Sequence, residues 1–197
     1  MILEKGGKQA MSSEILPFPD KKYQIILADP PWSYRNKKVF SKFKNKLGYV
    51  DGGCLNKYPT MSLDEICNLP LGDIADKNSV LFLWATVPLL PEAFQVLTAW
   101  GFKYKTMLTW RKIMSLGMGF WFRGQCEHLI LGIKGKIPAF RLQESNFIQC
   151  KVLRHSKKPH EFRQLIERAT QKMTLQNRIE LFARQKTDGW DVWGNEV

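Results

Sequence analysis

The order of apolar runs and helix-like segments constrains this fold more than any other feature of the sequence. Five short runs rich in Ile, Leu, Phe and Trp predict strands, and most are too continuous for a sheet with one wet face. These runs are Tyr23–Ala28, Ser79–Trp84, Lys105–Trp110, His128–Ile133 and Arg178–Phe182. Helix signals alternate with them at Ser62–Asn68, Pro91–Trp100 and Pro159–Thr170. This alternation predicts an α/β fold in which a central sheet is covered on both faces.

The length of the chain suits a single domain spanning residues 1–197. Within it we expect an N-terminal extension over residues 1–22 and a basic loop over residues 33–57. The first twenty residues hold charges and no long apolar core, and no apolar run reaches the ~20 residues of a membrane span. We therefore expect a cytoplasmic protein with no membrane partner.

The four cysteines form neither a disulfide framework nor a zinc motif. No C-x-x-C pair is present among Cys54, Cys67, Cys126 and Cys150. Cys126 and His128 stand two apart, but no second pair has the spacing of a zinc site. We expect reduced, mostly buried thiols and no metal.

The charge balance points to a polyanionic partner. The chain has 30 Lys and Arg residues against 18 Asp and Glu residues, a net charge of +12, and nucleic acid is the leading candidate. Residues 33–57 interleave lysines with aromatic rings, a pattern that suits phosphates and exposed bases together. A solvated lysine-rich loop is the alternative. The lysines that we expect to hold the strand are Lys37, Lys38, Lys42 and Lys44.

The first predicted strand ends in Asp29-Pro30-Pro31-Trp32. Prolines supply carbonyls but no N–H donors, and their fixed φ keeps the turn extended. The tetrapeptide therefore offers a stiff edge of acceptors beside a flat ring. Such an edge could hold the exocyclic amine of adenine, with Asp29 and the Pro30 carbonyl accepting its two N–H bonds and Trp32 stacking on the base. The structural alternative is a Pro-Pro stop after a buried strand.

Ordered blocks over most of the chain make it similar to the MT-A70 family of N6-adenine methyltransferases, which includes the messenger-RNA adenosine methyltransferase and many phage and bacterial enzymes. The resemblance is closer to the phage and bacterial branch. The blocks are Ala28–Trp32, Tyr58–Ile66, Leu81–Thr86, Gly119–Arg123, Glu127-His128, Ser156–Pro159, Ile179–Arg184 and Gly189–Glu196.

The resemblance implies a Rossmann-like methyltransferase sheet in permuted order, with the catalytic strand first and much of the donor site last. It also implies S-adenosylmethionine as methyl donor. Lys158 would pair with the methionine carboxylate of the donor, and Glu180 and Arg184 would reach its ribose. Asn195, with Glu196 beside it, would close over the adenosine moiety. Each of these side chains could instead have an ordinary structural role.

On the acceptor side, the resemblance implies that Asp29, Pro30, Pro31 and Trp32 form the catalytic motif, with Asp29 also near the donor. Tyr58 matches a family tyrosine beside the acceptor base, although core packing would also explain it. Residues 112–123 hold glycines and aromatic rings between Lys112 and Arg123, so we expect them to meet the nucleic acid. Trp121 and Arg123 are the contacts expected there.

Three other side chains near these motifs have plainer expected roles. Trp84 and Trp110, at predicted strand ends, suit the core or a pocket wall. His128 suits a structural role.

These observations predict an enzyme that methylates the N6 amine of adenine in DNA. Three alternatives stay open: an RNA adenosine methyltransferase, a cytosine N4 methyltransferase, and a catalytically silent nucleic-acid-binding subunit. The sequence leaves the oligomeric state open, a homodimer included.

Overall fold

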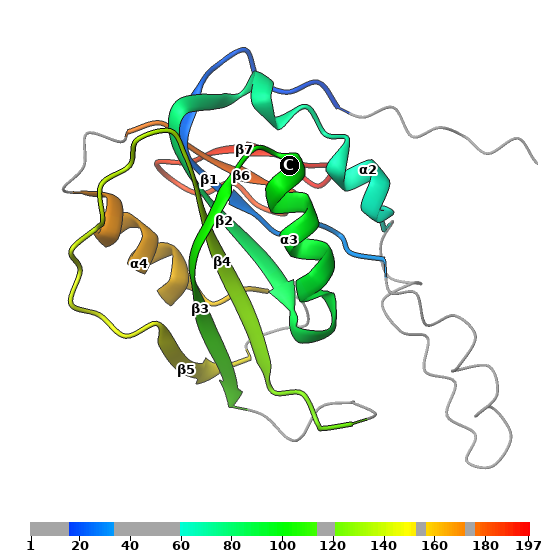
Figure 1. The fold of residues 1–197 in the computed structure, drawn as a ribbon, viewed down its shortest axis with the longest axis vertical. Coiled ribbons are helices and arrows are strands. Elements are labelled where there is room, and N and C mark those ends of the chain that lie inside the picture. Colours follow the sequence, from blue (N-terminus) through cyan, green and yellow to red (C-terminus); the bar gives the residue numbers. More distant parts are fainter. Residues whose placement is uncertain (1–15, 34–59, 114–120, 153–156, 172–175) are drawn as a thin grey trace, which may run out of the picture.

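The computed structural model describes residues 16–33, 60–113, 121–152, 157–171 and 176–197. Its centre is a seven-stranded sheet in the order β5-β3-β4-β2-β1-β6-β7 (Figure 1). The strands are β1 (Tyr23–Ala28), β2 (Ala75–Thr86), β3 (Lys103–Ile113), β4 (Cys126–Lys134), β5 (Phe147–Lys151), β6 (Arg178–Leu181) and β7 (Asp191–Trp193). The α-helices are α2 (Leu63–Cys67), α3 (Leu90–Ala99) and α4 (His160–Gln171), and short 3₁₀ turns span Leu71–Asp73 and Val87–Leu89.

The direction of the strands decides which ends meet. β1 lies parallel to both β2 and β6, and β6 lies parallel to β7. β4 runs antiparallel to β2 and β3, and β5 is parallel to β3. As a result, the carboxyl ends of β1, β2 and β6 share one edge of the sheet with the beginning of β4.

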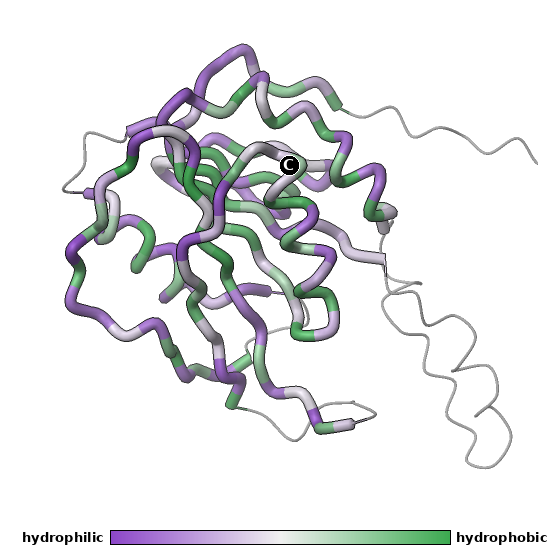
Figure 2. The backbone as a smooth tube through the Cα atoms, in the orientation of Figure 1, coloured by the Kyte–Doolittle hydropathy of each residue, from purple (hydrophilic) through white to green (hydrophobic). Residues whose placement is uncertain are grey.

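The two faces of the sheet are covered by different helices. Along β1 the side chains alternate, so Ile26 packs in the cluster that holds α2 and α3, and Ile25 packs in the cluster that holds α4. Val96 of α3 is buried in the first of these clusters, and Ile166 of α4 is buried in the second. Figure 2 shows hydrophobic residues along the central strands. The predicted α/β class, the Rossmann-like sheet and the helices on both faces are confirmed.

Local signals placed most elements well. The predicted strand Tyr23–Ala28 is β1 itself. The predicted capping box is present at α2, where Ser62 Oγ accepts a hydrogen bond from the Glu65 N–H at 3.2 Å and Glu65 Oε2 accepts one from the Ser62 N–H at 2.6 Å. This reciprocal pair satisfies two of the donors that a helix start leaves unpaired.

Two expectations need correction. The run Lys105–Trp110 is not covered on both faces: β3 is mostly exposed or half-buried, and Trp110 is its one fully buried residue. The first four residues of β3 are exposed, and the next three are half-buried. The thiols of Cys67, Cys126 and Cys150 are free as expected but only partly buried, and Cys54 lies outside the described residues.

Within the described segments, no helix has the length and apolarity that a membrane crossing requires. The same segments hold no cluster of three or more His, Cys, Asp or Glu side chains suited to a metal ion.

Candidate active site

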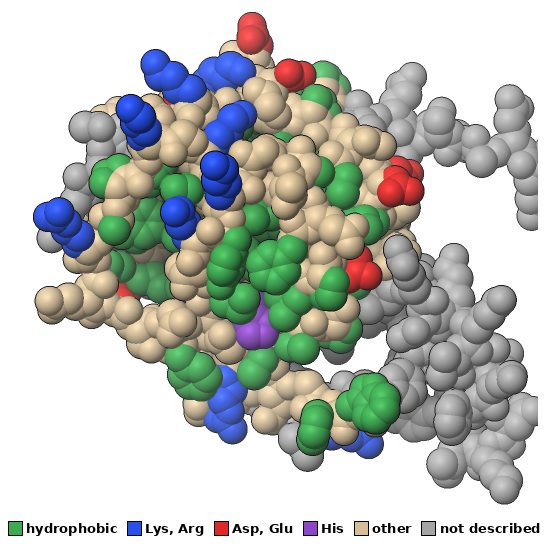
Figure 3. Space-filling model, in the orientation of Figure 1, with side chains coloured by type: hydrophobic (Ala, Val, Ile, Leu, Met, Phe, Trp, Pro, Cys, Tyr) green, Lys and Arg blue, Asp and Glu red, His purple; other side chains and the backbone are tan. Residues whose placement is uncertain are grey.

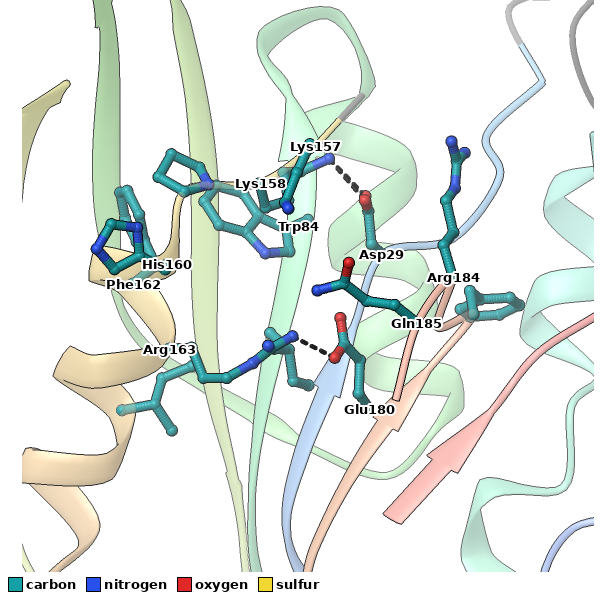
Figure 4. A pocket seen from close by; sticks show the side chains of 14 residues that line it. Asp29, Trp84, Lys157, Lys158, His160, Phe162, Arg163, Glu180, Arg184 and Gln185 are labelled. Atoms are coloured by element: carbon teal, nitrogen blue, oxygen red, sulfur yellow. Dashed lines mark hydrogen bonds and ion pairs between the residues drawn. The ribbon is translucent and has the colours of Figure 1, made fainter. Parts of the chain in front are cut away.

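A cavity of about 290 Å³ opens at the carboxyl ends of β1 and β6 (Figure 4). Asp29 enters it directly after β1, and Trp84 enters it from β2. Glu180 comes from β6, and Lys158 comes from the segment that leads into α4. Because parallel strands end at one edge of a sheet, residues far apart in sequence meet there, as is general for ligand sites in α/β folds.

The cation of Lys158 is held between two carboxylates. Its Nζ donates to both oxygens of Asp29, at 2.8 and 2.7 Å, and lies 3.5 Å from Glu127 Oε2. It also lies 5.3 Å from the centroid of the Trp84 ring. Burial alone lowers the pKa of Lys158, but the charges of Asp29 and Glu127 outweigh it, and the net shift is upward. Lys158 therefore stays charged at neutral pH.

Glu127 extends this network, and sequence reasoning gave it no catalytic role. It lies near the start of β4, opposite Thr86 of β2, and its carboxylate accepts a hydrogen bond from Lys112 Nζ. Burial raises the pKa of Glu127, but the combined effect of Lys158 and Lys112 is larger and lowers it, so the net shift is downward. The antiparallel pairing of β4 brings the start of this strand to the site, and no local pattern in the sequence reports that pairing.

A second charge pair joins Glu180 to Arg163. Arg163 Nη2 donates to Glu180 Oε2, and its Nη1 donates to Thr187 Oγ1 at 2.8 Å. Burial raises the pKa of Glu180 more than the Arg163 guanidinium lowers it, and the negative charge of Asp29 raises it further. The buried Nε of Arg163 has no acceptor among the described residues. Sequence reasoning missed Arg163, although it stands beside Phe162 at the border of the apolar stripe of α4.

The backbone after β1 is held at several points. The Trp32 N–H donates to the Pro30 carbonyl at 2.8 Å, and the Pro31 carbonyl accepts from the Met61 N–H at 2.9 Å. Trp32 Nε1 donates to the Trp84 carbonyl at 3.1 Å, which fixes the indole against the end of β2. The Pro30 oxygen keeps a second lone pair free for another donor. The motif is thus a rigid turn with one proline carbonyl still able to accept.

The segment after β6 turns back toward the cavity. Phe182 adopts a positive φ of 60°, which is uncommon for a residue with a side chain, and it lines the cavity. Arg184 follows and also lines it, with Nε 3.5 Å from Glu196 Oε1. Asn195 and Glu196 are exposed and do not line this cavity.

The remaining expected contacts lie apart from the cavity. Trp121 and Arg123 are exposed on the connection that leads into β4. The expected strand-binding lysines and Tyr58 lie outside the described residues, namely Lys37, Lys38, Lys42, Lys44 and Tyr58.

The neighbouring aromatic and imidazole groups have structural contacts. Trp110 Nε1 donates to the Cys150 carbonyl at 3.2 Å from a fully buried ring. The Nδ1 of His128 lies 3.2 Å from Thr109 Oγ1, and burial lowers the pKa of this imidazole. Trp84 is buried and forms part of the cavity wall. These placements agree with the plainer roles expected from sequence.

Known proteins resemble the chain over nearly all of its length. A family model described as MT-A70 matches residues 23–196. The Type II methyltransferase M.MunI of Mycoplasma sp is 33% identical, in an alignment that covers 98% of this chain and 86% of that protein. The catalytic subunit METTL3 of the N(6)-adenosine-methyltransferase from Homo sapiens is 26% identical over 89% of this chain. The MT-A70-like N(6)-adenosine-methyltransferase of Arabidopsis thaliana is 27% identical over the same share.

The relatives differ in how much of their own length is matched. The chain spans 28% of the human protein and 24% of the Arabidopsis protein, but most of M.MunI. The match over residues 23–196 confirms the family and the enzyme class predicted from the sequence: the chain belongs to the MT-A70 family of N6-adenine methyltransferases.

Proposed function

We propose that this protein transfers a methyl group from S-adenosylmethionine to the N6 amine of adenine in DNA. The observation that carries the proposal is the placement of Asp29, at the rigid Asp-Pro-Pro-Trp turn, in one cavity with Lys158 and Glu180. The choice of DNA rests on the similarity to a Type II methyltransferase over 98% of the chain. The family match over residues 23–196 supports a single methyltransferase domain with residues 1–22 as an extension.

The side chains of the cavity suit the methyl donor. A bound donor would supply an electrophilic methyl group, a charged amino-acid end, a ribose diol and a flat base. Lys158 would hold the donor carboxylate, and Glu180 would accept hydrogen bonds from the ribose hydroxyls, as carboxylates after strands do in nucleotide-binding folds. The buried Arg163 Nε still lacks an acceptor among the described residues, which a polar ligand could provide. Arg184, Asn195 and Glu196 would approach from the rim.

Asp29 and Pro30 would bind the amine of the target base. One N–H of the amine would donate to Asp29 and the other to the free lone pair of the Pro30 carbonyl, which draws the nitrogen toward a localised lone pair. Trp32, fixed by its hydrogen bond to Trp84, would stack on the base. Pro30 and Pro31 have no N–H, so the Trp32 N–H is the donor within the turn that reaches the Pro30 carbonyl, and the second lone pair of this oxygen is left for the amine. Tyr58 would lie on the acceptor side.

Lys158 and the amine would share the carboxylate of Asp29. Both Asp29 oxygens accept from Lys158 here, and each has a further lone pair that can accept from the amine. Glu127, 3.5 Å away, offers the ammonium a second anchor. We infer that Lys158 shifts toward Glu127 and the donor carboxylate as the ligands bind.

The test is incubation of the purified protein with isotope-labelled donor and random-sequence libraries of single-stranded DNA, duplex DNA and RNA. Mass spectrometry of the nucleosides should find N6-methyladenine in DNA. Methylation confined to RNA would favour the activity named for the METTL3 relatives. Methylated cytosine, or no product on any polymer, would refute the proposal. Asp29→Ala serves as the control, because product that persisted in this variant would exclude the acceptor role of Asp29.

A further inference from the structure

Two consecutive aromatic rings stand almost fully in water. Trp121 is 94% exposed and Phe122 is 91% exposed, whereas every other exposed large hydrophobic side chain of the described residues stays below half. Bare aromatic rings are unusual on a soluble surface and mark places where another molecule binds. Neither ring belongs to the cavity described above.

The rings lie shortly before β4, the strand whose first residues reach the proposed active site. They lie on the connection into β4, at the lower edge of Figure 1, and Glu127 follows on the same strand. Glu127 contacts Lys158, which holds Asp29. Glu127 is the sixth residue after Trp121, so the backbone of Trp121 lies within about 20 Å of the backbone of Glu127 even if the chain between them is fully extended. The rings can therefore touch a strand whose target base lies at Asp29.

The charge around the rings selects the kind of partner. Residues 121–125 read Trp-Phe-Arg-Gly-Gln, with an exposed Arg123 and no acid. Figure 3 shows hydrophobic side chains projecting at this lower edge with Lys or Arg side chains beside them. The whole chain carries a net charge of +12. Flat rings flanked by cations suit a stack of bases with phosphates on either side better than an apolar protein surface.

We propose that Trp121 and Phe122 form a wedge that enters the duplex base stack beside the target adenine. This inference rests on the proposed function. An adenine in a duplex must leave the stack before its amine can reach Asp29, and opening the stack costs free energy. Apolar side chains inserted between base steps offset that cost in other nucleic-acid-binding proteins. A single strand needs no such opening, so the wedge should matter for duplex DNA alone.

The experiment compares one random-sequence DNA library in single-stranded form and copied into duplex. The double variant Trp121→Ala/Phe122→Ala should lower the ratio of duplex to single-strand methylation by at least about tenfold, with single-strand activity kept. Trp121→Phe, which retains a ring, should restore most of the ratio. Tyr104→Ala is the matched control, because Tyr104 is a half-exposed ring near the start of β3, at the end of this strand that is distant from Trp121 in the sequence. It should leave the ratio unchanged.

Several results would overturn the wedge. One is a double variant with an unchanged ratio of duplex to single-strand methylation. Another is a double variant that loses activity equally on both substrates while its unfolding midpoint stays that of the wild type. A wild-type protein that methylates single strands only, or RNA only, has no duplex to open, and the wedge fails even though the methyltransferase stands. A wild-type protein inactive on every polymer removes the proposed function and the wedge together. A wild-type dimer that the double variant converts to monomer, by sedimentation, would assign the rings to contact between copies instead.

Discussion

Two lysine–aspartate pairs sit at opposite ends of β1 and have the same 2.7 Å separation. Just after the last residue of β1, Asp29 pairs with Lys158, and the two side chains are 27% and 21% exposed. Near its beginning, Lys21 pairs with Asp191 at exposures of 46% and 45%. Tyr23 also donates to Asp191, at 2.8 Å. The chemistry is the same at both ends, but the amount of water around it differs.

That difference separates the proposed active site from a structural contact. The charges of Lys158 and Asp29 belong to a chain that continues through Glu127 to Lys112 and is partly shielded from solvent. The Lys21 pair faces solvent, where ion pairs contribute only about 0–1 kcal/mol to stability. Partial burial makes the first pair sensitive to any ligand that brings or removes a charge. Breaking the two pairs should therefore have very different consequences.

The largest effect should come from the aspartates. Asp29→Ala should lower methylation by about 10³-fold or more, because the amine loses an acceptor that is positioned for the transition state. Asp191→Ala removes the matching carboxylate at the other end of β1 and should keep activity within about twofold once allowance is made for folding. Product formation per hour, measured by mass spectrometry at matched folded fraction, decides the comparison. Equal losses would mean that Asp29 acts through the fold alone.

The lysines should differ next, in donor binding. Lys158→Met should weaken donor affinity by about tenfold to a hundredfold, because a charge-assisted contact to the donor carboxylate is lost. Lys21→Met should leave the affinity unchanged. Titration calorimetry with the purified protein provides both dissociation constants. A Lys158→Met variant that binds the donor normally would restrict Lys158 to the acceptor side.

Glu127 should produce a pH-dependent effect on stability. Its folded pKa lies below the ordinary value of 4.5, so its ionised form stabilises the fold above that value and this contribution is lost as the pH falls through the folded pKa. Glu127→Gln should therefore lower the free energy of unfolding by about 2 kcal/mol at neutral pH, with the gap closing in acid. Denaturant titrations at several pH values measure it. A gap that stayed constant with pH would contradict the assigned charge coupling.

The smallest effect should appear at the exposed pair. Lys21→Met should reduce the free energy of unfolding by less than about 1 kcal/mol, since the pair is solvated and screened by salt. Thermal unfolding at low and high salt checks this, because the small difference should shrink as salt rises. A loss comparable to that of Glu127→Gln would show that burial is not what distinguishes the two ends.

The sequence predicted the parts of this molecule that depend on local pattern. A continuous apolar run is sufficient to place β1, and a capping box is sufficient to begin α2. The strands β5 and β7 were not predicted: β7 has three residues, and β5 alternates between exposed and half-buried positions, so neither gives a long apolar run. Fold class and the Asp29 turn were therefore accessible without the structure.

The candidate site was only partly accessible, since long-range pairing assembles it. Asp29, Lys158, Glu180 and Arg184 do share a cavity. The sequence did not predict their partners in the structure. The antiparallel register of β4 with β2 places Glu127 at the site, and the orientation of α4 places Arg163 beside Glu180. Asn195 and Glu196 were assigned from the resemblance and stand outside the cavity. A motif identifies which residues have reactive groups, but the sheet decides which of them neutralise one another.

The hydrogen bond from the Met61 N–H to the Pro31 carbonyl brings two points of the chain together across residues 32–60. The intervening segment therefore leaves and returns at one place, and its length does not alter the position of Asp29. Doubling the length of such a closed segment costs only about 0.6 kcal/mol of closure entropy. A change in the length of the segment between these two points should therefore leave the free energy of unfolding within that margin and Asp29 in place.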